Sequence, residues 1–452
     1  MKVLLIQPPS VDSLTDQIFL FEPLALEYLG AGLIQDGHEV QLLDARIDPD
    51  YEDACRRFEP DVVGLTGFTS HVNIIKTIAS HVRSMSSKTL IVVGGHHATV
   101  QPKDYNDSHI DVVVIGEGVF TLQEIIRTWE MGGKFSDIHG VAIPNIKSMV
   151  FSKPRQYTNL NELPFPDRSL TAAYRRHYFS EWFKPLASVR TSLGCTGRCN
   201  FCALWKITGG KYLRRNPEKV VEELLTVAEP NVFFCDDESM CDVRRMDKLA
   251  DLIAAAGIHK KYFLYGRVDT IVNHPELFAK WAKIGLSQVF VGMEDFSDKR
   301  LEAMKKGITT AQQAEAVKIL DRLGIMMYAS YMVDPAFTRE DFSSLMAYVR
   351  KMKHKYISFT VLTPLPGTEL FTAREQELLS RKPELYDMLH ALFPTTLPME
   401  EFYKEVANLW TKSVPLYRVL PTLFRFGLHG MFVRIRLFNR VLAKSKLLHL
   451  DY

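Results

Sequence analysis

The chain has 452 residues, of which 46% are apolar and 24% charged, so it is long enough for two or three hydrophobic cores and too apolar to be largely disordered. Its 55 basic and 53 acidic residues give a net charge of +2, which argues against an overall field that attracts nucleic acid. The opening run MKVLLIQPPS is shorter than a signal-peptide core, and no apolar stretch reaches membrane-spanning length. We therefore expect a cytoplasmic, multidomain globular protein with no nucleic-acid partner.

Short apolar runs alternate with helical segments in the first part of the chain. Such runs are typical of parallel strands covered on both faces, and the segments 22–36 and 73–85 have the period of amphipathic helices. The pattern predicts a doubly wound, Rossmann-like α/β domain over residues 1–135. The expected strands are residues 2–6, 40–44, 61–65, 89–93 and 111–115.

Residues 136–185 are rich in proline, polar and aromatic residues without a sustained period, which is typical of an ordered linker. A second alternation of strands and helices follows. It predicts a partial (β/α)6 barrel of TIM type over residues 186–375, whose chemistry would lie at the carboxyl ends of its strands. The expected strands are residues 187–192, 231–236, 262–267, 288–294, 326–333 and 356–362, and the expected helix starts are Pro217, His274, Asp298, Thr310 and Arg339.

Residues 376–452 are expected to form a helical C-terminal domain. From Leu416 to Leu448 this tail is both basic and apolar. Two interpretations stay open: a helical cap packed on the barrel, or a helix that contacts a membrane surface or a lipid.

The most informative segment is RTSLGCTGRCNFCALW, which places Cys195, Cys199 and Cys202 in one glycine-containing loop after a strand. Three thiolates from one loop can ligate three irons of a [4Fe–4S] cubane and leave the fourth iron open to a substrate. A zinc knuckle is the alternative, but zinc sites usually take four ligands in paired C-x2-C halves. Cys235 and Cys241 do not form such a half, and core packing is the simpler interpretation of Cys235.

The motif C-x3-C-x-F-C after the first strand of a β/α barrel resembles the radical S-adenosylmethionine (SAM) superfamily, with Phe201 before the third cysteine. The resemblance implies a [4Fe–4S] cluster on the three cysteines and SAM contacts at the ends of later strands. The usual Gly-Gly-Glu of the second strand is replaced here by acids, and the segment 363–371 resembles the turn after the sixth strand. The implied SAM-binding residues are Phe201, Asp236, Asp237, Glu238, Arg267 and Glu294.

The N-terminal domain resembles the cobalamin-binding module of B12-dependent radical SAM enzymes through QPP (7–9), EPLALEYLGAGL, TGFTSH (66–71), VGGHHAT (93–99) and GEG (116–118). Glycine turns between strand and helix let the backbone approach a bulky ligand. The element D-x-H-x-x-G is absent from residues 44–49, which implies a base-off cofactor without a histidine ligand, although His71, His96 and His97 can line the site. The implied cobalamin-binding residues are Pro9, Thr66, Ser70, His71, Gly94, Gly95, His96, Gly116 and Glu117.

Three further segments, EPLALEYLGAG, WAKIGLSQVFVGME and LFPTTLPMEEFY, resemble the hopanoid C-3 methylase group. The resemblance implies methylation of an unactivated carbon, in an apolar or lipid-like substrate, by a 5′-deoxyadenosyl radical and methylcobalamin. It also implies an electron donor such as flavodoxin or ferredoxin. Two alternatives stay open: cyclisation or oxidation of a lipid, tetrapyrrole or peptide without methyl transfer, and a non-catalytic iron–sulfur or cobalamin sensor.

Overall fold

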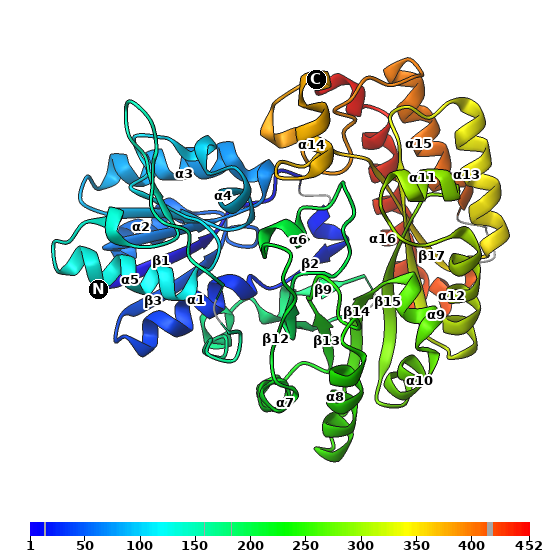
Figure 1. Cartoon of the computed structure of the whole chain (residues 1–452), viewed down its shortest axis with the longest axis horizontal. Helices are drawn as coiled ribbons and strands as arrows, with labels where there is room; N and C mark the ends of the chain where they lie inside the picture. Colours follow the sequence, from blue (N-terminus) through cyan, green and yellow to red (C-terminus); the bar gives the residue numbers. More distant parts are fainter. Residues whose placement is uncertain (13–14, 158, 182, 414–418) are drawn as a thin grey trace. The chain divides into compact units, whose positions relative to one another are not determined.

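The computed structural model describes residues 1–12, 15–157, 159–181, 183–413 and 419–452. The chain divides into two compact units (Figure 1). Unit 1 comprises Met1–Gly194 and Ala203–Phe233, and unit 2 comprises Cys195–Cys202 and Phe234–Tyr452. Each unit is described on its own below.

Unit 1 is built on a seven-stranded sheet with the order β3-β1-β4-β5-β6-β7-β8. Its first five strands are parallel, as predicted, and β7 and β8 extend the sheet antiparallel beyond residue 135. These two strands are too short to show a period in the sequence. The strands are β1 (Lys2–Gln7), β3 (Glu39–Asp44), β4 (Val62–Thr66), β5 (Leu90–Gly94), β6 (Val112–Val114), β7 (Val141–Ile143) and β8 (Val150–Phe151).

Helices cover both faces of this sheet (Figure 1). Val3 and Leu5 of β1 pack with α1 (Leu24–Gln35) and α5 (Val119–Glu130). Leu4 and Ile6 pack on the other side with α2 (Tyr51–Phe58) and α3 (Val72–Met85). Alternate residues of a strand point to opposite faces, so a strand buried on both faces must be apolar throughout. The strand order reverses next to β1, and the carboxyl ends of strands at such a switch point are where doubly wound domains bind ligands.

The remainder of unit 1 leads toward the cysteine loop. Short helices η5 (Arg168–Thr171) and η6 (Arg175–His177) precede β9 (Phe179–Ser180), which pairs with β2 (Phe19–Leu20). Next come β10 (Leu186–Val189), which is the edge strand beside β13 (Asn231–Phe234), and α7 (Pro217–Thr226). The predicted strand 187–192 is therefore split, because Ser192 pairs instead with Arg214 in the ribbon of β11 (Ser192–Leu193) and β12 (Leu213–Arg214).

Unit 2 contains four parallel strands, β14 (Lys261–Gly266), β15 (Leu286–Glu294), β16 (Met326–Val333) and β17 (Tyr356–Val361). The six predicted barrel strands are therefore all present, two in unit 1 and four in unit 2. The predicted helix starts are also confirmed, to within one residue. The helices that alternate with these strands are α7 in unit 1 and, in unit 2, α8 (Val243–Ala255), α9 (Val268–Asn273), α10 (Pro275–Lys283), α11 (Asp298–Ala303), α12 (Thr310–Arg322) and α13 (Arg339–Met352).

Local chemistry explains these starts. Thr309 and Thr338 form capping boxes with Gln312 and Asp341, and prolines occupy the first position of α7 and α10.

The tail is helical, as predicted. α15 (Met399–Ser413) packs on α13 and β17, and α16 (Val419–Ser445) packs on α15. Residues 414–418, at the start of the basic and apolar segment, lie outside the described residues. Within the described residues, no helix has both the length and the apolar character needed to cross a membrane.

Candidate functional site

The three cysteines lie in the loop between β11 and α6 (Leu204–Ile207). Cys199 is buried, and Cys195 and Cys202 are partly exposed. The Gly197 N–H donates to Cys195 Sγ over 3.3 Å, and the Cys202 N–H donates to the Cys199 carbonyl over 3.2 Å. No three His, Cys, Asp or Glu side chains of the described chain converge as ligands of a single metal ion. In a cubane, by contrast, each thiolate ligates its own iron.

Asn200 anchors this loop to the rest of unit 2. Its backbone N–H donates to the Met304 carbonyl over 3.1 Å, and its side-chain amide donates to the Ala303 carbonyl over 2.9 Å. Its own carbonyl accepts the Leu370 N–H, at 2.9 Å, from α14 (Glu369–Arg374). Phe201, a predicted SAM contact, packs against the apolar cluster of Met304, Met332, Leu362 and Leu370. The loop is therefore held by both polar and apolar contacts.

Arg267 lies against the cysteine loop. A Cβ on Gly197 would lie 2.6 Å from Arg267 Nη1, so a larger residue there would displace the guanidinium. Asp269 holds the guanidinium at 2.9 and 3.0 Å. Burial raises the pKa of the Cys195 thiol, and the Gly197 N–H and the Arg267 charge oppose that rise. The fixed cation therefore favours a thiolate, which is the form that binds iron.

Lys306 is a second buried cation, which sequence reasoning missed. Its Nζ donates to Glu294 Oε1 over 2.5 Å, and its carbonyl accepts from Arg267 over 3.2 Å. Burial lowers the pKa of Lys306, but the Glu294 carboxylate and the neighbouring Cys199 raise it, and the net shift is upward. Lys-Lys-Gly after a short helix looks like a solvated turn. The available signal was the position of Lys306, twelve residues after Glu294 at the end of a barrel strand.

The acids after β13 have different surroundings. Asp236 and Glu238 are about 1% exposed, whereas Asp237 is only partly buried. Glu238 Oε1 accepts the Met240 N–H over 3.2 Å, and its carboxyl is hydrogen-bonded to Cys241. Burial raises the pKa of Glu238 to about 7, against the opposing charge of Arg267. Cys241 therefore belongs to the surroundings of Glu238.

The donor set of unit 2 fits the implied cofactors. Three thiols in one anchored loop suit a [4Fe–4S] cluster, and nearby cations offset the negative charge of thiolate ligands. Buried carboxyl groups at strand ends suit the ammonium group of an amino acid.

In unit 1, turns that contain glycine follow the carboxyl ends of β4, β5 and β6, and their backbone is not covered by side chains of its own. Gly95 has φ +99°, and a Cβ there would lie 2.4 Å from Thr66 Oγ1. Gly116 has φ +88° and donates its N–H to Thr99 Oγ1 over 3.0 Å. Pro9, Ser70 and Gly94, the other small predicted contacts, lie after or at the ends of β1, β4 and β5. These turns suit the close approach of a large flat ligand.

The three histidines near these turns have different roles. His97 is buried and bonded to Thr69 Oγ1 at 3.0 Å and Asp104 Oδ2 at 2.9 Å, so both ring nitrogens have protein partners. His71 Nδ1 accepts the Phe68 N–H over 3.3 Å, which leaves the proton of the neutral ring on Nε2. Burial lowers the pKa of His71 and of His96 to about 4, with smaller contributions from Arg46 and His97 respectively.

An uncharged aromatic surface results. Phe68 is 63% exposed, and its ring centroid lies 6.1 Å from that of His71 and 5.7 Å from that of His96. Such a surface fits the face of a corrin ring.

Arg46 lies after β3, within the segment where D-x-H-x-x-G is absent. The two carboxylate oxygens of buried Asp44 hold its guanidinium at 2.8 and 2.6 Å, and the Phe21 carbonyl accepts from Nη2 over 2.8 Å. A guanidinium stays protonated and does not ligate cobalt. The segment therefore offers a fixed positive charge where the absent element would offer a histidine.

Glu117 has a structural role at the start of α5. Its carboxylate oxygens accept the N–H groups of Val119 and Phe120 at 2.5 and 3.2 Å. Burial raises its pKa although these two bonds oppose the rise. Its prediction as a cobalamin contact therefore depends on its backbone, because both oxygens already cap the helix.

Comparison with known proteins agrees with both halves of this description. The B12 binding domain model matches residues 19–126, and the Radical SAM superfamily model matches residues 189–349. Hopanoid C-3 methylase of Methylococcus capsulatus is 29% identical over 90% of this chain and 79% of its own. An anaerobic magnesium-protoporphyrin IX monomethyl ester cyclase of Synechocystis sp. is 23% identical over 92% of this chain and 85% of its own.

A solved structure shares the fold. The radical SAM methyltransferase TsrM from Kitasatospora setae, with cobalamin and a [4Fe–4S] cluster bound, superposes with a TM-score of 0.73 at 17% identity, covering 98% of this chain and 99% of that one. The fold and the site thus define a radical SAM enzyme with a B12-binding domain. The cofactors that these two domains imply are a [4Fe–4S] cluster, SAM and cobalamin.

Proposed function

We propose that this enzyme methylates an unactivated carbon of an apolar, lipid-like substrate. The observation that carries the proposal is the combination, in one chain, of an anchored three-cysteine loop and a bare-backbone site at the carboxyl edge of a B12-binding sheet. Similarity to hopanoid C-3 methylase over 90% of the chain supports both the methyl transfer and the lipid-like substrate. When bound, the cofactors supply an electron, a 5′-deoxyadenosyl radical that takes hydrogen from the substrate, and the methyl group.

The residues of unit 2 bind and orient. Cys195, Cys199 and Cys202 would hold the cluster, and Asn200 keeps their loop in place. We assign the acids after β13 to the ammonium group of SAM, and Arg267 and Glu294 to its remaining polar groups. Lys306 orients the Glu294 carboxylate, and both side chains are less than a tenth exposed. Phe201 and the methionines beside it exclude water from one side of the loop.

In unit 1, the glycine turns after β4, β5 and β6 would receive cobalamin, with Pro9, Thr66, Ser70 and the two neutral histidines around it. Phe68 adds an apolar face.

The experiment is anaerobic turnover of the reconstituted enzyme with SAM, methylcobalamin and reductant on a panel of polycyclic lipids. Methyl transfer consumes two SAM molecules for each product, so S-adenosylhomocysteine and 5′-deoxyadenosine should form in equal amounts. The product should be heavier by one CH2 unit, because the methyl group replaces the hydrogen atom that the radical removes. Deoxyadenosine and an unmethylated product would instead support cyclisation or oxidation, which the similarity to the cyclase keeps as the second candidate. Cys199→Ser should abolish both products, whereas Cys55→Ser, in the core of unit 1, is the matched control.

A peripheral membrane contact through α16 would bring the enzyme to such a substrate. Leu428 and Phe432 are each 73% exposed, and Ile435 is 42% exposed, so one stripe of the helix presents large apolar side chains to solvent. Arg436 and Arg440, both exposed, flank the stripe. The sequence of α16 contains no acidic residue, so its charge is complementary to an anionic lipid surface.

A further inference from the structure

Strand β10 lies at the edge of its sheet, and its free edge is closed by side chains and turns from earlier in the chain. The Leu186 N–H donates to the Tyr178 carbonyl over 3.1 Å, and the Ser188 N–H donates to Glu22 Oε1. The Ser188 carbonyl accepts from Arg168 Nη2 over 2.7 Å. An edge strand normally leaves such groups open to solvent or to another chain. Here three separate positions satisfy them.

Two of these positions, residues 21–22 and Tyr178, also hold Arg46, which follows the carboxyl end of β3. The carbonyl of Phe21, next to Glu22 in the chain, accepts from Arg46 Nη2 over 2.8 Å. The Tyr178 hydroxyl donates to Asp44 Oδ2 over 3.1 Å, and that carboxylate bonds Arg46. Two short routes therefore join the loop after β3 to alternate residues of β10, one through residues 21–22 and one through Tyr178.

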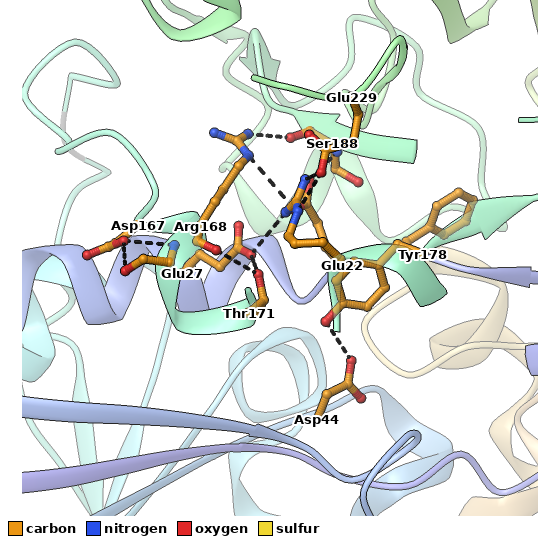
Figure 2. A network of polar contacts seen from close by, with 12 residues as sticks. Glu22, Glu27, Asp44, Asp167, Arg168, Thr171, Tyr178, Ser188 and Glu229 are labelled. Carbon is orange, nitrogen blue, oxygen red and sulfur yellow. Dashed lines mark hydrogen bonds and ion pairs between the residues drawn. The ribbon is translucent and has the colours of Figure 1, made fainter. Parts of the chain in front are cut away.

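The groups in these two sets of contacts are charged and buried, which restricts their movement. The carboxylates of Glu22 and Asp44 have no exposed side-chain surface. Figure 2 shows Glu22, Arg168, Tyr178, Ser188 and Asp44 within one network. Arg175 bonds both Glu22 and Glu229, and its guanidinium lies 5.9 Å from the centre of the Tyr178 ring. A buried charge that loses its partner is strongly destabilised, so the members of this network can only move together.

We propose that Glu22 and Tyr178 are positioning residues that couple the cobalamin-binding loops to strand β10, which leads into the cysteine loop. The inference rests on the proposed cobalamin site. Strand β3 is the neighbour of β1 at the switch point, so a ligand seated there restrains the Arg46 loop. The contacts through residues 21–22 and through Tyr178 then restrain the free edge of β10. Cobalamin bound in unit 1 thus stiffens the strand that carries the cluster loop, and by reciprocity the strand influences cobalamin affinity.

The test is hydrogen–deuterium exchange of the full-length, cluster-loaded protein with and without hydroxocobalamin, followed in a peptide that covers β10. In the wild type we expect cobalamin to slow exchange of this peptide by about threefold or more. Tyr178→Phe removes one hydroxyl and keeps the ring, and it should remove most of the cobalamin-dependent slowing. Tyr51→Phe is the matched control, because it deletes a hydroxyl bonded to His81 at 2.7 Å on the surface of the same unit.

Glu22→Gln keeps an acceptor for the Ser188 N–H, removes the negative charge that pairs with Arg175, and should lose the slowing in the same way. If Tyr178→Phe does not fold, Glu22→Gln alone tests whether the network couples cobalamin binding to β10. Wild-type slowing in both variants would overturn the inference, as would cobalamin binding to the wild type without any slowing in β10. Failure of the wild type to retain cobalamin through gel filtration would instead overturn the proposed cobalamin site, and the inference with it.

Discussion

Thr171 donates a hydrogen bond to Glu27 over 2.5 Å, and neither residue is exposed to solvent. Glu27 lies in α1, and Thr171 ends η5 in the linker. Burial, followed by repulsion from the Glu22 carboxylate, raises the pKa of Glu27 to about 8, so this carboxyl group is protonated at neutral pH. The charges of the network around it then balance: Arg168, Arg175 and Arg215 against Glu22, Glu223 and Glu229.

The raised pKa of Glu27 predicts a pH-dependent stability. The folded state holds this proton more tightly than the unfolded state, so the contribution of Glu27 is full below its ordinary pKa and is lost as pH rises toward 8. One such group changes the free energy of unfolding by at most about 1.4 kcal/mol per pH unit. Glu27→Gln keeps the acceptor for Thr171 and cannot ionise, so it should raise the melting temperature more at pH 8 than at pH 6. Equal shifts at both pH values, or the same pattern in the surface variant Glu52→Gln, would contradict this.

Lys306 and Lys305 offer a matched pair of substitutions. The Lys306 side chain is buried in its ion pair with Glu294, whereas the Lys305 side chain is 59% exposed in its ion pair with Glu369. Lys306→Met would leave a buried carboxylate without its cation, a change that typically costs about 3–5 kcal/mol. We expect SAM to bind at least about tenfold more weakly to Lys306→Met, and with wild-type affinity to Lys305→Met. Equilibrium dialysis with labelled SAM measures both, and equal affinities would refute the role given to Lys306.

Asn200 should matter for cluster retention without being a ligand. Asn200→Asp replaces the amide that donates to Ala303 by a carboxylate, which repels that carbonyl and releases one anchor of the cysteine loop. We expect iron per protein after gel filtration to fall by about twofold or more, with a heterogeneous EPR signal from the reduced cluster. The exposed Asn145→Asp should leave both unchanged. A normal iron content and a single EPR species in Asn200→Asp would show that the anchor is dispensable.

Helix α16 should bind anionic vesicles. Cosedimentation with vesicles containing phosphatidylglycerol should recover the wild type, and neutral phosphatidylcholine vesicles should recover much less, because the exposed stripe adds arginines to its apolar surface. Phe432→Glu should abolish binding. Met131→Glu changes a residue that is similarly exposed, at 72%, in unit 1 and should have no effect. Wild-type recovery of Phe432→Glu would remove α16 as the membrane contact.

His390 should stabilise the end of the chain only while it is protonated. Its ring nitrogens lie 3.0 Å from Asp387 and 3.1 Å from Asp451, and these carboxylates raise its pKa although burial lowers it. The stabilisation is full below the ordinary pKa of about 6.5 and is lost as pH rises through the folded value. Asp451→Asn should therefore lower the melting temperature clearly at pH 6 and little at pH 9. An equal loss at both values would assign Asp451 a role independent of this charge.

Most of the strands, the helix starts and the cysteine loop were predicted from the local spacing of residues along the chain. Runs such as residues 2–6 and 61–65 are typical of buried strands, and the capping residues Thr309 and Thr338 mark the starts of helices. These signals depend only on neighbours along the chain. Cys195, Cys199 and Cys202 were identifiable for the same reason, since all three stand in one loop. Their assignment to a cluster and a cobalamin domain agrees with the family matches.

The contacts that give these residues their chemistry depended on the tertiary structure. Lys306 became recognisable only when folding buried it beside Glu294 and the cysteine loop, and Glu22 only when it met Ser188, 166 residues later. The sequence by itself therefore determined the long strands, the helices between them and the cysteine loop, because periodicity and spacing act locally, but it did not predict the short strands β7 and β8. Only the fold decided which charges are buried together, because burial and pairing of distant charges are set by packing and leave no periodic trace in the chain.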